Sequence, residues 1–124
     1  MNVLLWVAAG LLAAAFLAAG LMKVSQPKDA MLARLPWVED FSSAQVKGIG
    51  VIEVLGAIGV ILPGVTTIAP ILVPSAATGL AITMVLAFVM HARRGEAKAS
   101  FAPNVVLFAL AVFVAWGRFG PYAF

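Results

Sequence analysis

The sequence predicts an all-α integral membrane protein: a bundle of four transmembrane helices with a short amphipathic segment at the membrane interface between the first two. Hydrophobic residues make up 64% of the 124 residues and charged residues only 10%, whereas a soluble domain carries about 25% charged residues. A core of this size cannot hide so much apolar surface from water, so lipid has to cover the remainder. The length fits a single domain over residues 1–124.

Four apolar runs predict the helices, at about residues 3–22, 46–62, 68–90 and 105–119. Crossing the hydrocarbon core takes about 20 residues, and about 17 is the lower limit. The second and fourth runs are therefore expected to tilt little or to lie in a locally thin bilayer. The first run lacks the basic residues that open a secretory signal, and we interpret it as a retained helix.

The first connection is the longest and most polar. Residues 29–35 are predicted to form the amphipathic piece at the interface, and Trp37 suits the headgroup level; the proline before Trp37 makes this connection a candidate lid over the bundle. Ser42 followed by Gln45 fits a capping box, which predicts that the second helix starts there. The second connection, residues 63–67, is expected to be a tight turn.

Orientation follows from the positive charges. Seven of the eight basic residues lie in or beside the first and third connections: Lys23, Lys28, Arg34, Lys47, Arg93, Arg94 and Lys98. Because Lys and Arg favour cytoplasmic loops, this side is expected to face the cytoplasm, with both termini facing outward from a bacterial inner membrane. An aromatic belt is expected on the outer side, formed by Trp6, Trp116, Phe119 and Tyr122. Arg118 is expected to snorkel outward there or to bind an anionic lipid.

Glu53 is the most informative polar residue, since it lies inside the second apolar run, seven residues beyond Val46. At 1.5 Å per residue it lies roughly 10 Å below the charged surface, where a charge costs about 3 kcal/mol or more. It therefore has to pair, protonate or line a cavity. A functional glutamate would carry a proton, anchor a substrate or act as a catalytic acid or base. The structural alternative is an interhelical ion pair that fixes the bundle.

Other polar residues are expected near the depth of Glu53, because neighbouring helices run in opposite directions. Lys23 ends the first helix and His91 the third, while Lys47 and Asn104 open the second and fourth. Glu53 and His91 are the candidate catalytic residues, since carboxylate and imidazole groups exchange protons. Lys23 and Asn104 are the candidate residues for binding a cofactor. Alternatively, the lysines snorkel to lipid headgroups, and His91 is an interfacial residue favoured by the helix dipole.

Several chemistries are excluded by composition. Without cysteine the chain has no disulfides and no thiol catalysis, and its one histidine cannot build a multi-histidine metal site, so no metal-ion site is expected. A haem held by His91 alone, or shared across a dimer, stays open. The basic residues lie in two blocks and are assigned to orientation, so nucleic acid is not an expected partner. Met22, Met84 and Met90 are interpreted as packed or lipid-facing rather than as the lining of an apolar pocket.

Small residues at a spacing of four predict where helices pack closely. On the first helix they are Gly10, Ala14 and Ala18, and on the second the pairs Gly48 with Ile52 and Gly56 with Val60 are weaker versions. These positions are expected to face neighbouring helices.

Four segments carry a family resemblance. They read G-L-M-K-V-S-Q-P-K, L-P-W-V-E-D-F-S, G-I-G-V-I-E-V-L-G-A-I-G-V-I-L-P and M-H-A-R-R-G-E. Together they resemble the DoxX-like family of small four-helix bacterial membrane proteins, over nearly the whole chain. The family takes its name from a subunit of a thiosulfate:quinone oxidoreductase, so the resemblance implies a redox-associated role and a quinone as candidate cofactor. Carried onto this chain, the implied site residues are Lys23, Glu53, His91 and Asn104.

Four functions remain open. The first is binding of a quinone or other lipophilic small molecule whose polar head meets Glu53 and His91, with electrons supplied by a soluble redox partner or another subunit. The second is a cofactor-independent enzyme doing acid/base chemistry on a lipophilic substrate. The third is a small proton-coupled exporter, and the fourth a non-catalytic membrane subunit. The expected partners are the lipid bilayer, the lipophilic molecule, and a redox partner or a second copy of the chain.

Overall fold

The computed structural model describes residues 1–32, 35–95 and 97–124, without the side chains of residues 97–101. The helices are α1 (Asn2–Ser25), α2 (Lys28–Leu32), the 3-10 helix η1 (Pro36–Asp40), α3 (Ser43–Gly59), α4 (Leu62–Thr66), α5 (Leu72–Arg93) and α6 (Ala97–Phe119). Among the described residues, four helical segments are long and apolar enough to cross a membrane: α1, α3 with α4, α5, and α6 from Ala102. The predicted all-α fold with four spans is confirmed.

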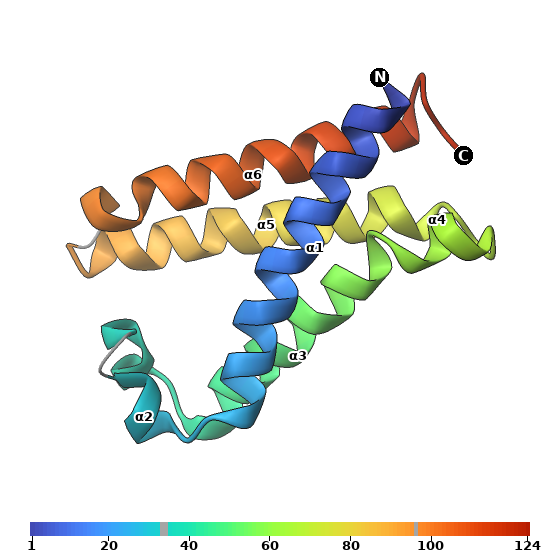
Figure 1. Cartoon of the computed structure of the whole chain (residues 1–124). Helices are drawn as coiled ribbons and strands as arrows, with labels where there is room; N and C mark the ends of the chain where they lie inside the picture. Colours follow the sequence, from blue (N-terminus) through green and yellow to red (C-terminus); the bar gives the residue numbers. More distant parts are fainter. Residues whose placement is uncertain (33–34, 96) are drawn as a thin grey trace.

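The four long helices form two antiparallel hairpins. α1 pairs with α3, α5 pairs with α6, and contacts of α1 with α6 and of α3 with α5 close the bundle. Both termini lie at one end, and α2, η1 and the α5–α6 connection lie at the other (Figure 1). The hairpins converge toward the termini and separate toward the opposite end, so the bundle is tapered (Figure 1).

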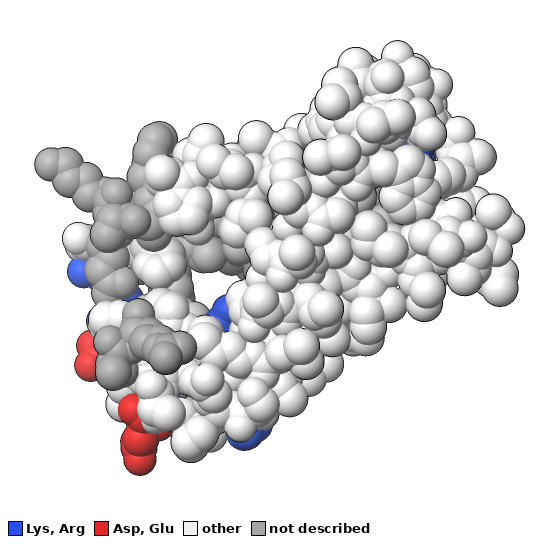
Figure 2. All heavy atoms as spheres, viewed as in Figure 1, with Lys and Arg blue, Asp and Glu red and all other residues white. Residues whose placement is uncertain are grey.

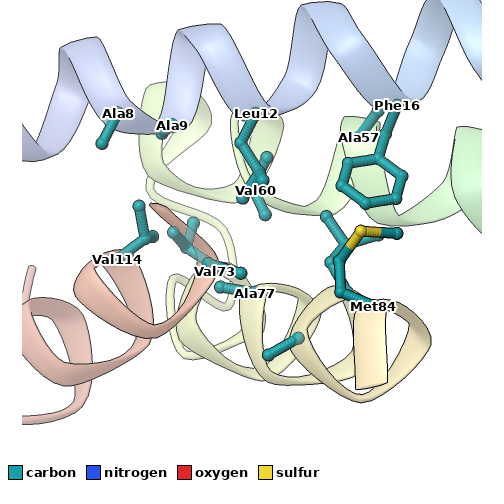
Figure 3. Close-up of a cluster of buried hydrophobic side chains, with 13 residues drawn as sticks. Ala8, Ala9, Leu12, Phe16, Ala57, Val60, Val73, Ala77, Met84 and Val114 are labelled. Atoms are coloured by element: carbon teal, nitrogen blue, oxygen red, sulfur yellow. The ribbon is translucent and has the colours of Figure 1, made fainter. Parts of the chain in front are cut away.

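The core of the bundle occupies the end near the termini. Figure 3 shows the main cluster of buried side chains, which includes Ala8, Ala9, Leu12, Phe16, Ala57, Val60, Val73, Ala77, Met84 and Val114. Many of these side chains are small, which lets helices approach closely in a solvent as apolar as the helices themselves. Phe16 and Met84 lie at one end of the cluster (Figure 3).

Glycines set the closest helix contacts. A Cβ atom on Gly20 would lie 2.7 Å from the carbonyl oxygen of Gly50, and one on Gly50 would lie 2.8 Å from that of Gly20, so α1 and α3 touch backbone to backbone. A Cβ atom on Gly56 would lie 2.5 Å from a methyl carbon of Leu80, which joins α3 to α5 farther along. Gly56 thus packs as predicted.

The predicted small-residue ladder on α1 is wrong. Gly10, Ala14 and Ala18 are all exposed, and nothing lies within 4 Å of a Cβ atom built on Gly10. The same holds for Gly48 on α3. The buried face of α1 instead contains both large and small residues, namely Leu5, Ala8, Ala9, Leu12, Phe16, Gly20 and Lys23, so small size alone did not identify the packed face.

Capping explains where α3 begins. The hydroxyl of Ser42 accepts a hydrogen bond from the backbone N–H of Gln45 at 3.1 Å, and the Gln45 side chain accepts one from the N–H of Ser42 at 2.9 Å. The predicted capping box is confirmed. It starts the helix at Ser43, three residues before the apolar run at 46–62.

Other boundaries differ from the apolar runs. α5 begins at Leu72 instead of residue 68, and residues 63–66 form most of α4 rather than part of a tight turn. α6 begins at Ala97 instead of residue 105, because Ala and Lys favour helix and extend it beyond the apolar stretch. α2 covers most of the predicted segment 29–35, of which residues 33 and 34 lie outside the described part.

Charge is distributed unevenly between the two ends. Figure 2 shows Lys, Arg, Asp and Glu side chains gathered at the end opposite the termini. The predicted separation of the basic blocks from the termini is therefore present in the fold. Which end faces the cytoplasm stays a prediction.

Arg118, the basic residue near the termini, does not snorkel outward as expected. It is 4% exposed and donates hydrogen bonds to the Asn2 side chain at 2.7 Å and to the carbonyl of Tyr122 at 2.9 Å. Its guanidinium also lies 4.0 Å from the centre of the Phe124 ring. The chain after α6 turns back and supplies acceptors inside the protein, so Arg118 joins the two ends of the chain.

Candidate functional site

A cavity of about 510 Å³ lies between the two hairpins, in the half of the bundle that carries the charged side chains. Phe16 and Met84, which end the core cluster, form part of its wall. Most of its other lining residues are apolar. The polar lining residues are Lys23, Glu53, Thr83, His91 and Asn104. All four candidate residues from the sequence thus face one cavity, each from a different long helix.

Lys23 and Glu53 form a buried ion pair across α1 and α3. Lys23 Nζ lies 2.6 Å from Glu53 Oε1, and the two side chains are 10% and 5% exposed. Each follows by three residues the glycine, Gly20 or Gly50, at which the antiparallel helices touch. The pair therefore straddles this contact, and because side chains lean toward the N-terminus of their own helix, the two lean toward each other.

This ion pair is the interhelical contact that the sequence offered as the structural alternative for Glu53. It also lies on the cavity wall, as a functional carboxylate would. Because α3 begins at Ser43, Glu53 lies ten residues into the helix, or roughly 15 Å from its start. The same geometry thus suits both a role in packing and a role toward a ligand.

η1 covers the charged end of the cavity. Trp37 lines the cavity, is 7% exposed, and has its ring centre 5.7 Å from Lys23 Nζ. Arg94, at the C-cap of α5, donates to Asp40 at 2.6 Å and to Glu39 at 2.9 Å, which ties η1 to the second hairpin. Trp37 is thus buried inside the protein, and its depth in the membrane stays a prediction. Arg94 forms ion pairs in addition to its predicted role in orientation.

His91 and Asn104 face the cavity from the second hairpin. His91 lies in the last turn of α5, as predicted. Asn104 lies seven residues after the start of α6 rather than at it, or roughly 10 Å along the helix. The Asn104 amide nitrogen is buried and has no hydrogen-bond partner among the described residues. A buried donor without a partner costs about 1–3 kcal/mol, so this atom calls for an acceptor from elsewhere.

The remaining predicted residues divide between wall and surface. Met22, Met84 and Met90 all line the cavity, which the sequence interpretation did not favour, while Met84 is also packed in the core cluster, as interpreted. Lys47 is exposed and donates to the carbonyl of Val24 at 3.2 Å, at the end of α1. The sequence did not single out Leu35, Phe41 and Ile49, which also line the cavity. Their apolar character resembles that of ordinary core residues and gave no indication of a pocket.

Comparison with known proteins identifies one relationship. Residues 7–114 match the model of the family described as the DoxX-like family. No curated protein and no solved structure matches the chain significantly. The matched range contains all four candidate residues.

Proposed function

Because the chain belongs to the DoxX-like family of membrane proteins, we propose that it binds a quinone, or another lipophilic molecule with a polar head, in the cavity between the hairpins. One observation carries this proposal: Lys23, Glu53, His91 and Asn104 converge on a single cavity whose remaining wall is mostly apolar. Ligand sites are mostly apolar with a few convergent polar groups. In this proposal the charged end faces the cytoplasm.

The donors in the cavity fit a carbonyl head. The Asn104 amide nitrogen has no partner among the described residues, and an ammonium group such as that of Lys23 has three donors, one of which Glu53 occupies. A carbonyl oxygen accepts from both kinds of donor. Glu53 and His91 are the groups able to pass protons to or from the head. A bound quinone would supply the redox chemistry, with electrons from a partner.

The buried ion pair supports a second candidate, a non-catalytic membrane subunit in which Lys23 and Glu53 only hold α1 to α3. The two candidates differ at Asn104, which has no structural partner among the described residues. Asn104→Leu keeps the branched shape of the side chain and removes the amide. It is expected to abolish ligand retention while leaving the fold intact or slightly more stable.

The test compares wild type, Asn104→Leu and a control, Thr78→Val, purified in mild detergent. Thr78 bonds to the carbonyl of Pro74 and does not line the cavity. Native mass spectrometry and absorbance would detect a co-purifying molecule, and circular dichroism would compare the folds. Retention in wild type and control but not in Asn104→Leu supports the proposal. If no small molecule co-purifies and added ubiquinone does not bind, the proposal is rejected in favour of the subunit role.

If a molecule is bound but dithionite does not reduce it, the redox part of the proposal fails. Chemical conversion of that molecule by the purified protein, without an electron acceptor, would then identify the acid/base enzyme. Glu53→Gln serves as a further variant. Loss of stability without loss of the ligand would assign Glu53 to packing alone.

A further inference from the structure

The wall of the cavity includes two largely exposed apolar side chains, one on α3 and one on α5. Ile52 and Leu86 line it, and they are 58% and 64% exposed. They are the most exposed of the large apolar side chains in its wall. Both belong to helices of membrane-spanning length and high hydropathy. The medium that meets the cavity at these residues is therefore the hydrocarbon of the bilayer.

The gap at Ile52 and Leu86 follows from where α3 and α5 touch. Gly56 packs on Leu80, and a Cβ atom on Gly59 would lie 2.8 Å from that of Ala76, so the close contacts lie on the side nearer the termini. Ile52 lies one turn beyond Gly56 toward the charged end. From there the helices separate, and no glycine contact of this kind joins them in the part of the chain that the structure describes.

Among the described residues, η1 and α2 cover the cavity on the side of the charged end. Trp37 and Val38 of η1 are 7% and 0% exposed, and Met31 of α2 packs against them. The ion pairs from Arg94 hold η1 across the charged end. A molecule arriving from the aqueous side would have to displace this segment, whereas one already dissolved in the bilayer meets only apolar side chains.

We infer that the ligand enters from the bilayer between Ile52 and Leu86, and that it is an amphiphile with a long apolar tail. Its hydrogen-bond-accepting head lies against Asn104 and the Lys23–Glu53 pair, and its tail remains in the gap between α3 and α5. This inference rests on the proposed function and adds the entry route and the need for a tail. A compact water-soluble metabolite would not dissolve in the bilayer and so would not reach this gap.

The test blocks the gap with Ile52→Trp and Leu86→Trp. Leu55→Trp and Ile82→Trp are matched controls, because Leu55 and Ile82 are 62% and 56% exposed on the same two helices and do not line the cavity. Protein in liposomes is mixed with donor liposomes containing ubiquinone-10 as the long-tailed probe. The protein is recovered at intervals, and bound quinone is quantified by chromatography. Duroquinone, which has no tail, is the second probe, measured at equilibrium.

Each variant at the gap is expected to slow loading of ubiquinone-10 by about tenfold or more relative to its control, while duroquinone binding changes by less than about twofold. If gap variants and controls load ubiquinone-10 at equal rates while Asn104→Leu binds neither probe, the inferred entry route is wrong and the proposed function stands. Slowing by Ala15→Trp instead, on the α1 side of the cavity, overturns it as well. If wild type binds neither probe, the proposed function fails together with the inference.

Discussion

Removal of one partner of the Lys23–Glu53 pair is expected to destabilise the protein far more than removal of both. Two unit charges 2.6 Å apart attract by about 6 kcal/mol at an effective dielectric constant of about 20. Taking each ion out of water costs several kcal/mol, so attraction and desolvation nearly cancel. Loss of one partner removes the attraction and leaves the other ion buried.

The magnitudes follow from this balance. Lys23→Met or Glu53→Met alone is expected to lower the free energy of unfolding by about 3–5 kcal/mol, whereas the double variant should lie within about 1 kcal/mol of wild type. Methionine approximates both side-chain volumes, so cavity formation contributes little. Glu39→Gln is the control. Its carboxylate pairs with Arg94 but is 62% exposed, so the loss should stay below about 1 kcal/mol.

The assay is a titration of the protein in mixed micelles with sodium dodecyl sulfate, followed by circular dichroism. The free energies of unfolding of wild type, the two single methionine variants and the double variant form a double-mutant cycle. This cycle isolates the coupling free energy between Lys23 and Glu53. Two results would refute the reasoning. One is a double variant that loses the sum of the single losses. The other is a pair of single variants no less stable than Glu39→Gln.

Three further predictions concern packing and the covering segment. Gly50→Ala should destabilise the bundle by about 1–3 kcal/mol, because its Cβ atom would lie 2.8 Å from the carbonyl oxygen of Gly20. Gly10→Ala should instead stabilise it by up to about 1 kcal/mol, because nothing lies within 4 Å of the added Cβ atom. The same titration with sodium dodecyl sulfate compares the two variants. Arg118→Lys should lower stability, because an ammonium lacks the planar guanidinium that lies over the rings of Phe124 and Trp6, and a thermal midpoint equal to wild type would contradict this. Arg94→Gln should make Trp37 more accessible to acrylamide quenching in a variant that lacks the other tryptophans; unchanged quenching would show that the ion pairs do not hold η1.

The parts of the fold that the sequence predicted are those with a strong local cause. The four apolar runs correspond to the four spans because the hydrocarbon core sets their length. The start of α3 was predictable because Ser42 and Gln45 satisfy their own backbone groups. The start of α6 was not predictable from hydropathy, because helix formation and membrane burial end at different residues there.

The candidate residues were found for a similar reason. Glu53 stood out because a carboxylate is costly in an apolar helix. Counting residues along helices that run in opposite directions predicted that Lys23, His91 and Asn104 lie at a similar depth. Depth alone does not give the face of a helix, so Lys47 was grouped with them although it lies outside the cavity. The burial of Arg118 and the ion pairs of Arg94 depend on tertiary contacts between segments more than fifty residues apart, which no local pattern records.

The taper of the bundle has a mechanical consequence. Because the hairpins meet near the termini and separate at the charged end, the protein occupies unequal areas in the two leaflets. Any widening or narrowing of the cavity changes mainly the area taken in one leaflet. The work of that change is the lateral tension of that leaflet multiplied by the area displaced. Lipid packing in that leaflet therefore acts on the width of the cavity, and compression of that leaflet alone would work to narrow it.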